Sequence, residues 1–474
     1  MSNKRDAEIP RIGGSVKVLI TGATGFIGHH LLPVLFEKGC EISVLTRNPE
    51  GAAEALGWPV KAFHWDPSKN QLDLAALEGV SAIVHLAGES IASQRWTDEV
   101  KKRIYSSRVD STRLLVKALS EGSGFPQVHT FVCGSAIGFY GETGEDKVEV
   151  GRPAGNDFLS VVCRDWEDAL FDSELPNLRK VTLRTGVVLG RDGGALQELE
   201  PIVAMGGAGP LGDGRQWMSW IHIKDLCRMI EFALSNREVH GPLNGVAPFP
   251  ERNKDFMQTF ADQVGRPAVL PTPKAAIRLV KGEMADFLLA SQKVVPSKSQ
   301  KLGFEFKFQR LSQAFQDLYP NGIVEQQRQF YQWVDQPIEQ VFRFFSDPKN
   351  LETLTPPEMG FQMVGLSTEQ VDAGTRIDYR LSMKGLPLKW QAEILKWDPP
   401  REFVDIQNRG PYQFWQHSHR FSSLKGGTLI EDHIRYKVPM SSLGQFVGGG
   451  LVDASIDQMF QYRRKVLAHL FRSK

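Results

Sequence analysis

The sequence predicts an α/β fold, a Rossmann-type doubly wound parallel sheet, followed by a second domain of the α+β class. Residues 16–28, VKVLITGATGFIG, join an apolar run to a glycine-rich turn, and strands and helices then alternate as in βαβ units. After the turn YPNG at 319–322, strands rich in aromatic side chains replace this alternation. We therefore expect a tail at 1–15, a first domain at 16–322 and a second at 323–474, and 474 residues suffice for two cores.

The three glycines of the opening turn have separate roles. The apolar run before them suits a strand buried on both faces. Gly22 permits the sharp turn, Gly25 lets the backbone approach a pyrophosphate, and Gly28 allows close packing of the helix on the strand. The free N–H groups of the new helix supply an anion site. The alternative is a glycine-rich loop that binds nothing.

The other elements of the first domain follow from apolar spacing and turn residues. The first helix ends at Gly39, and Pro33 inside it predicts a kink or a break near His29. A glycine-rich stretch at 190–220 predicts a mobile cover over the active site, unless it is a plain surface loop. The next strands are expected at Glu41–Leu45, Val60–Trp65, Ala82–Leu86 and Thr130–Cys133, and a long helix is expected at Asp98–Ser120.

Composition excludes several classes of function. Lys and Arg total 56 and Asp and Glu total 55, so no strong field exists to attract nucleic acid. No apolar stretch reaches the length of about 18 residues that a membrane-spanning helix needs. The four cysteines have no paired spacing, which indicates reduced thiols and a cytoplasmic location. We expect a small-molecule substrate, no nucleic acid and no membrane span.

The ends of the second, third and fourth strands indicate which cofactor would bind. Arg47 follows the second strand, where an acid normally binds the ribose of NAD, and an arginine there favours the 2′-phosphate of NADP(H). The alternative is a solvated arginine at a strand end. Asp66 ends the third strand within reach of an adenine edge, and Ala87 and Gly88 let the backbone come near the cofactor.

Five motifs, in this order, carry a resemblance to a known family: GATGFIG, HLAGE at 85–89, GSAIGFYG at 134–141, RTGVVLG at 184–190 and WIHIKDL at 220–226. They resemble an extended short-chain dehydrogenase/reductase. The segment RWTDEVKKRIYSSRVDSTRLLVKAL and NGVAP at 244–248 narrow this to the atypical, epimerase-like subgroup of the NAD-dependent epimerase/dehydratase family, over about 16–319. The turn, the strand ends and the resemblance together assign NADP(H) contacts to Gly22, Thr24, Gly25, Phe26, Ile27, Arg47, Asp66, Leu86, Ala87, Gly88, Arg184, Gly186 and Val187.

One departure from this family affects the chemistry. Its members normally use a tyrosine and a lysine four residues apart, in which the phenol exchanges a proton and the ammonium lowers its pKa. Alignment on Glu167 places Leu159 and Cys163 at these two positions. The remaining catalytic candidates are Ser135, at the usual hydroxyl position, and Tyr140 on the following loop. A helix cap and packing are the respective alternatives.

Two other reactive side chains of the first domain have simpler interpretations. Cys163 would need a lowered pKa to act as a nucleophile, so we expect an inert core thiol. His222 lies in the WIHIKDL motif, which in the resembling family positions the substrate lobe and starts a helix. We therefore expect a structural role for His222.

The second domain resembles the polyketide-cyclase/START-like (SRPBCC) superfamily, whose helix-grip fold is α+β. WVDQPIEQVFRFFSDPKNLETLTPP, in which we expect a helix at Ile338–Phe345, is the most telling segment. An antiparallel run of strands follows it, and we expect a long helix from about Val452, after Gly448 to Gly450. The resemblance implies an apolar-ligand pocket. Candidate wall residues are Phe361, Trp390, Trp397, Trp415 and Met459. His417 and His419 share one strand face, but two ligands without a third favour hydrogen bonding, so no metal is assigned.

We therefore predict an NADP-dependent, epimerase-like oxidoreductase that acts on an unidentified small molecule and carries a C-terminal apolar-ligand pocket. Hydride transfer needs only cofactor and substrate geometry, so a reductase with a rearranged proton donor is consistent with the missing pair. The alternative is a non-enzymatic NADP(H)-binding sensor or scaffold. A third alternative is that the second domain carries a lipid and the first domain has a structural role.

Overall fold

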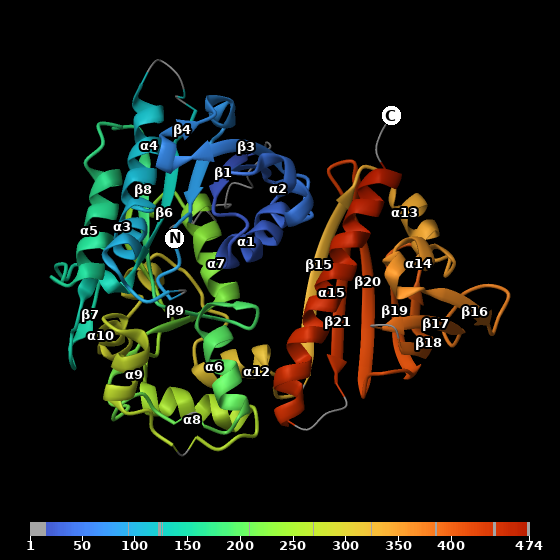
Figure 1. Cartoon of the computed structure of the whole chain (residues 1–474). Coiled ribbons are helices and arrows are strands. Elements are labelled where there is room, and N and C mark those ends of the chain that lie inside the picture. Colours follow the sequence, from blue (N-terminus) through green and yellow to red (C-terminus); the bar gives the residue numbers. More distant parts are fainter. Residues whose placement is uncertain are drawn as a thin grey trace, which may run out of the picture.

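The computed structural model describes the backbone of residues 16–92, 94–121, 125, 127–207, 209–268, 270–323, 325–383, 386–438 and 442–471, and it excludes the side chains of 383, 386 and 442–451. The predicted tail at 1–15 lies outside these residues. The described residues form two large sheets, each with its own helices (Figure 1), and three two-stranded sheets.

The first sheet has eight strands in the order β12-β8-β6-β5-β1-β2-β3-β4. All neighbours pair in parallel except β3 and β4, so the predicted parallel sheet is confirmed. The strand order reverses between β1 and β5, which is the switch point where such sheets bind ligands. The bounds are β1 Lys17–Thr21, β2 Glu41–Thr46, β3 Lys61–Asp66, β4 Gln71–Leu72, β5 Ala82–His85, β6 Thr130–Ala136, β8 Arg179–Thr185 and β12 Gly241–Gly245.

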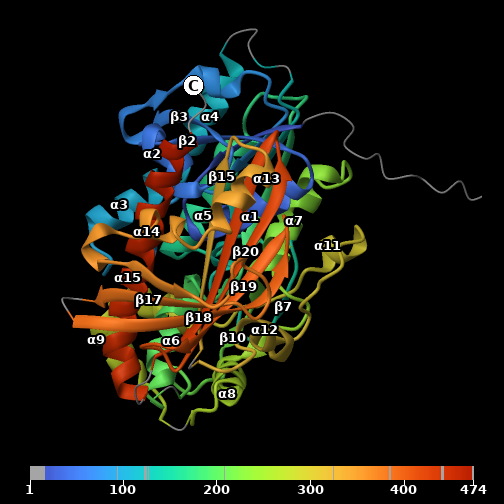
Figure 2. The same ribbon diagram turned by 90° about the vertical axis from the view of Figure 1, so that its right-hand side faces the viewer.

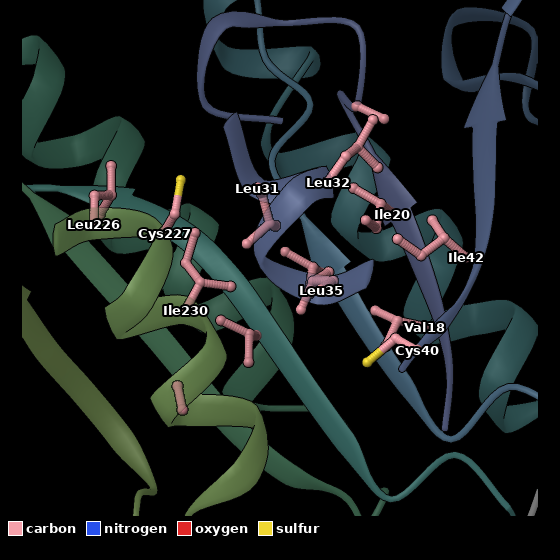
Figure 3. Packing of buried hydrophobic residues seen from close by; sticks show 14 of the residues in the cluster. Val18, Ile20, Leu31, Leu32, Leu35, Cys40, Ile42, Leu226, Cys227 and Ile230 are labelled. Atoms are coloured by element: carbon pink, nitrogen blue, oxygen red, sulfur yellow. The ribbon is translucent and has the colours of Figure 1, made fainter. Parts of the chain in front are cut away.

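Helices cover both faces of this sheet because its central strands are apolar on both sides. Val18 and Ile20 of β1 belong to the core beneath α1 and α7, as Figure 3 shows, whereas Leu19 belongs to the core beneath α4. The helices of this part are α1 Phe26–Glu37, α2 Pro49–Leu56, α3 Asp98–Ser106, α4 Val109–Ser120, α5 Phe158–Phe171, α6 Gly194–Ala204, α7 Ile223–Ser235, α8 Asn253–Gln263, α9 Lys274–Lys281, α10 Met284–Leu289, α11 Ser297–Lys301 and α12 Leu311–Leu318.

Short strand pairs and 3-10 turns complete the first domain. Strand β7 pairs with β14, β9 with β11, and β10 with β13. Their bounds are β7 Lys147–Val148, β9 Val187–Gly190, β10 Trp217–Met218, β11 Trp220–His222, β13 Glu251–Arg252 and β14 Lys293–Val294, and the 3-10 turns are η1 Pro67–Lys69, η2 Leu74–Leu77 and η3 Ile137–Tyr140.

The structure bears on three local predictions, of which the single helix at 98–120 is wrong. Helix α1 continues through Pro33 without a break near His29, because Leu31, Leu32, Leu35 and Phe36 bury its face. The predicted helix at 98–120 divides into α3 and α4 at Ser107-Arg108. There the Ser111 and Thr112 hydroxyls donate to the Arg108 carbonyl, and such bonds compete with a regular helix ladder. The stretch at 190–220, predicted as a mobile cover or a plain surface loop, contains α6 with Leu196 and Val203 buried, and its role as a cover stays a prediction.

The second sheet has seven antiparallel strands in the order β15-β21-β20-β19-β18-β17-β16. The long helix α15 packs on it through Ile456, Phe460 and Leu467; Figure 1 shows its length, and in Figure 2 strands β17 and β18 cross in front of it. The bounds are β15 Gln326–Val334, α13 Ile338–Phe345, α14 Asn350–Thr353, η4 Pro357–Met359, β16 Gln362–Leu366, β17 Arg376–Met383, β18 Leu386–Asp398, β19 Glu402–Arg409, β20 Phe414–Leu424, β21 Gly427–Lys437 and α15 Ser442–Leu470.

Helix α13 has the predicted bounds, but α15 begins at Ser442 instead of near Val452. Gly448 to Gly450, expected before the helix, lie inside it. Each glycine costs about 1 kcal/mol in a helix, and packing of the downstream apolar face outweighs such propensities.

The first domain contacts strand β15 of the second sheet through the turn that ends α2. The Trp333 N–H donates to the Gly57 carbonyl at 2.9 Å, and the rings of Trp58 and Tyr331 have centroids 4.9 Å apart. Gly57 has φ +70°, and a Cβ there would lie 1.8 Å from the Tyr331 carbonyl oxygen. Position 57, where β15 meets the first domain, therefore requires glycine for two reasons: the positive φ and the lack of space for a Cβ. No helix in the part of the chain that the structure describes could cross a membrane.

Candidate cofactor and active site

The glycine-rich turn lies at the switch point between β1 and β5. Gly22 has φ +71°, and a Cβ there would be 2.8 Å from the backbone of Leu86 and Ala87. A Cβ on Gly28 would be 2.3 Å from the Gly22 carbonyl oxygen, so the helix can approach the strand only with glycine at this position. The predicted roles of Gly22 and Gly28 agree with this geometry.

Helix α1 begins at this turn with free backbone donors. Gly25 is its N-cap, and no side chain accepts a hydrogen bond from the first turn. Thr24 and Gly25 are exposed. Unpaired N–H groups at a helix start favour an anion such as a pyrophosphate. The ring of Phe26 instead packs on the turn at 190–194, where a Cβ on Gly193 would lie 2.5 Å from it.

A buried histidine joins β1 to β5 behind this turn. His85 Nδ1 lies 2.6 Å from the Thr21 hydroxyl and its Nε2 lies 3.0 Å from the Ser111 hydroxyl. The Thr21 hydroxyl also accepts from the Ala87 N–H at 3.1 Å, which fixes the start of the predicted Leu86–Gly88 contact segment. Burial lowers the pKa of His85 to about 3, so the imidazole is neutral.

Arg47 and Asp66 differ in how far their side chains are already engaged. Arg47 is exposed and directly follows β2, with no hydrogen bond or ion pair to another described residue. Its guanidinium is therefore available to a phosphate. Asp66 accepts from the Ser68 N–H and hydroxyl and pairs with Lys69 at 3.1 Å. It caps the turn η1, and sequence reasoning did not anticipate this local role.

Ser135, at the end of β6, belongs to a buried polar network. Its hydroxyl donates to Glu167 at 2.7 Å. Arg184 binds the same carboxylate through Nε at 2.8 Å and Nη2 at 2.7 Å, a bidentate pair in which both side chains are 5% exposed. Burial lowers the pKa of Arg184, but the hydrogen bonds and charge of Glu167 outweigh this and the net shift is upward.

Tyr140 occupies the other side of Arg184. Its hydroxyl donates to Asn244 at 2.6 Å and accepts from Arg184 Nη1 at 2.9 Å. The guanidinium also lies 3.4 Å from the ring centroid of Phe139. Tyr140 is 2% exposed, and this burial raises the pKa of its phenol. The structure thus joins Ser135 to Arg184 through Glu167, and Arg184 in turn to Tyr140.

The positions of the missing tyrosine and lysine are apolar. Leu159 and Cys163 are buried on α5 beneath Gly138. Burial raises the pKa of the Cys163 thiol to about 12, so it remains protonated at neutral pH. All four cysteines are buried and none forms a disulfide.

Arg108 is a site residue that sequence reasoning missed. Its guanidinium carbon lies 3.1 Å from where a Cβ on Gly88 would stand. It donates to the Ile104 carbonyl and stacks over Trp166. Burial lowers the pKa of Arg108, and the charge of Glu89 opposes this. The signal in the sequence that could have found it is its position within the motif at 95–119.

Gly186 and Val187, predicted to contact the cofactor, follow β8. The Gly186 N–H donates to the Gly245 carbonyl at 3.1 Å, and a Cβ on Gly186 would lie 2.5 Å from the Ser219 carbonyl oxygen.

His222 caps α7, accepts from the Lys224 N–H and lies 3.3 Å from Asp317. Its predicted structural role agrees with these contacts.

The second domain contains a cavity of ≈ 170 Å³ between its sheet and α15. Its lining includes all five predicted wall residues: Phe361, Trp390, Trp397, Trp415 and Met459. His417 and His419 lie on the same wall. The His417 Nε2 and the Asp432 carboxylate are hydrogen-bonded at 2.9 Å, as expected for a buried histidine.

Two family profiles match the chain. The NAD dependent epimerase/dehydratase family matches residues 18–158, which contain the glycine-rich turn, Arg47 and Ser135. A domain of unknown function, DUF1731, matches residues 272–318.

Two curated relatives have similar extents. The epimerase family protein SDR39U1 homolog, chloroplastic, of Arabidopsis thaliana is 38% identical over 298 residues, which is 63% of this chain and 85% of that protein. The human epimerase family protein SDR39U1 is 35% identical over 309 residues, covering 64% of this chain and 99% of that protein.

Solved structures show the same fold. The crystal structure of human epimerase family protein SDR39U1 (isoform2) with NADPH has a TM-score of 0.58 and 33% identity, covering 65% of this chain and all of that one. The UDP-glucuronic acid 4-epimerase of Bacillus cereus, in complex with UDP-glucuronic acid and NAD, has a TM-score of 0.52 at 19% identity over 64% of this chain and 98% of that one, which shows the fold alone.

Proposed function

The chain belongs to the NAD-dependent epimerase/dehydratase family, with the SDR39U1 proteins, and from this premise we propose that it is an NADP(H)-dependent, epimerase-like oxidoreductase of an unidentified small molecule. The observation that carries the choice of cofactor is the free guanidinium of Arg47 directly after β2. The solved human relative, named as a structure with NADPH, supports the same choice.

The residues at the switch point fit a dinucleotide. Gly22 and Gly28 leave no room for side chains, and α1 begins with backbone donors that no side chain caps. These donors would hold the pyrophosphate, and Arg47 would bind the 2′-phosphate. Leu86 to Gly88, Gly186 and Val187 would face the remainder of the cofactor. Bound NADP(H) supplies hydride chemistry, which this chain's residues orient.

Ser135 is our first candidate for contact with the reacting group of the substrate. It lies at the end of β6, and Glu167 fixes the orientation of its hydroxyl. Tyr140 is the second candidate, and it would have to give up its hydrogen bond to Asn244 before it could donate to a substrate. Arg184 makes three hydrogen bonds to two side chains, Glu167 and Tyr140, and is therefore a positioning residue for both candidates.

A non-enzymatic NADP(H) sensor is the second candidate function. The observation in its favour is that Leu159 and Cys163 are buried and apolar where the proton relay of the family would lie. Incubation of the protein with NADPH deuterated on its transferable face and a metabolite extract distinguishes the two. Deuterium found in a metabolite supports the oxidoreductase; deuterium retained on bound cofactor, without solvent exchange or epimerised product, supports the sensor.

Arg47→Asp tests the cofactor assignment. Loss of a charge-assisted hydrogen bond to phosphate predicts NADPH binding weaker by about 1–3 kcal/mol, with a smaller effect on NADH. Arg237→Asp is the matched control because Arg237 is also exposed and lies near Arg179, at the opposite edge of the sheet. Fluorescence titration with both cofactors measures the affinities. Equal NADPH affinity in the Arg47 variant and the wild type would remove Arg47 from the site.

For the second part of the chain we propose a START-like, helix-grip domain spanning 323–474 that binds an apolar or amphipathic small molecule. Its antiparallel sheet, its long helix and the cavity between them support this. We propose residues 16–322 as the catalytic domain. A cytoplasmic location stays a prediction, supported by the four free cysteines. Mass spectrometry of an extract of the purified protein tests the cavity, since lipid carriage predicts a retained guest.

A further inference from the structure

Five polar side chains gather at one wall of the cavity in the second domain. Asp405 of β19 lies opposite His417 of β20, and Asp432 of β21 lies opposite His419. Residues two apart on a strand share a face, so all four point to the same side of the sheet. Arg463 of α15, the helix that packs on this sheet, is the fifth member of the group and is 3% exposed.

Asp405, His417 and His419 have the arrangement of three metal ligands. Asp405 Oδ2 lies 3.4 Å from His419 Nε2 and 3.9 Å from His417 Nδ1, and one ligand atom from each residue lies within 4.8 Å of the others. Ligands held about 2.1 Å from a tetrahedral metal stand about 3.4 Å apart. These two distances are thus longer than ordinary hydrogen bonds but close to the distance between two ligand atoms of one tetrahedral metal.

Asp432 has the position of an outer carboxylate beside both imidazoles. It is hydrogen-bonded to His417 Nε2 at 2.9 Å, and it lies 2.7 Å from His419 Nδ1 without the alignment of a hydrogen bond; both nitrogens are on the side away from Asp405. Metal-binding histidines generally donate their second N–H to such a carboxylate, which fixes the tautomer and directs the other nitrogen to the metal. Arg463 pairs with Asp432 at 3.4 Å and compensates its charge.

The charges at this wall can accommodate a cation. Among the described residues Arg463 pairs with Asp432, whereas the ion-pair partners of Asp405 are the two imidazoles, so either a proton on them or a bound metal balances the charge of Asp405. Asp405, His417, His419 and Arg463 all line the cavity, so the remaining coordination positions of a metal would face the apolar space.

We propose that Asp405, His417 and His419 bind a divalent transition metal at the polar end of the cavity, with Asp432 and Arg463 as positioning residues. Two histidines and one carboxylate suit zinc or ferrous iron, with positions open to a guest. The guest would then be an apolar molecule with one carbonyl, hydroxyl or carboxylate oxygen to place on the metal. This site is independent of the NADP(H) site of the first domain.

Titration of the chelator-treated full chain with Co²⁺ and Zn²⁺ tests the proposal. The visible absorption of Co²⁺ should report one tight site with nitrogen and oxygen ligands, and Zn²⁺ should displace the Co²⁺. Asp405→Asn, which keeps the side-chain shape, should weaken Co²⁺ binding about 100-fold or more, and Asp432→Asn should weaken it about 10–100-fold. His433→Gln is the matched control, since His433 lies on the same strand as Asp432 but faces the other side of the sheet.

Circular dichroism of each variant checks that it is folded, and His419→Gln gives a second ligand variant if Asp405→Asn is not. The control should bind Co²⁺ as the wild type does. No tight binding by the wild type, or equal affinities in the wild type and a folded ligand variant, would overturn the proposal. Either result would leave the five side chains as a cluster of polar and charged groups without a metal.

Discussion

Glu167→Gln should destabilise the first domain strongly. The carboxylate accepts from Ser135 at 2.7 Å and from Arg184 at 2.8 and 2.7 Å, and both members of the ion pair are 5% exposed. A glutamine offers one acceptor oxygen and turns an NH₂ group toward the guanidinium. Because the buried charge of Arg184 is then uncompensated, we expect a loss of about 3–5 kcal/mol in the free energy of unfolding.

The assay must isolate the first domain, since a chain with two cores does not unfold in one step. Hydrogen exchange of peptides from β6 and β8 of the full chain gives the free energy of opening at the site itself. Glu121→Gln is the matched control: Glu121 pairs with Lys117 at 3.5 Å, but the two side chains are 67% and 56% exposed. We expect less than about 0.5 kcal/mol there. A loss below about 1 kcal/mol for Glu167→Gln would refute the view that Arg184 depends on this carboxylate.

Three further predictions follow. Gly28→Ala places a Cβ 2.3 Å from the Gly22 carbonyl oxygen, so it should cost about 1–3 kcal/mol and abolish NADPH binding in a fluorescence titration, whereas Gly151→Ala, with open space around it, should do neither. Tyr140→Phe should abolish deuterium transfer from labelled NADPH only if the phenol donates the proton; unchanged transfer would leave Ser135 as the candidate. His85, with a pKa lowered by burial to about 3, is neutral in the folded state, whereas the unfolded state gains a proton below pH 6.5. Stability should therefore fall as the pH drops from 6.5 toward 3, by roughly 2 kcal/mol at pH 5 for this group, and hydrogen exchange in β5 should show it; flat exchange over that range would contradict a neutral buried His85.

The sequence by itself determined the parallel sheet, the positions of most strands and the glycine-rich turn. These depend on local patterns, because apolar runs, glycines with positive φ and helix caps act over a few residues. Gly22, Gly28 and α13 illustrate this, since each fits its predicted position. Arg47 could be selected for the same reason: it directly follows a strand whose end was predictable.

Only the tertiary structure decided which distant side chains meet. Ser135 and Glu167 are separated by 32 residues, and Tyr140 and Asn244 by 104, so no periodicity connects them. Asp405 joined His417 and His419 because β19 pairs with β20 in one register, and a shift of one residue would have turned it to the other face. Local spacing identifies elements and turns, whereas strand pairing across the sheet brings ionisable groups close enough to form a site.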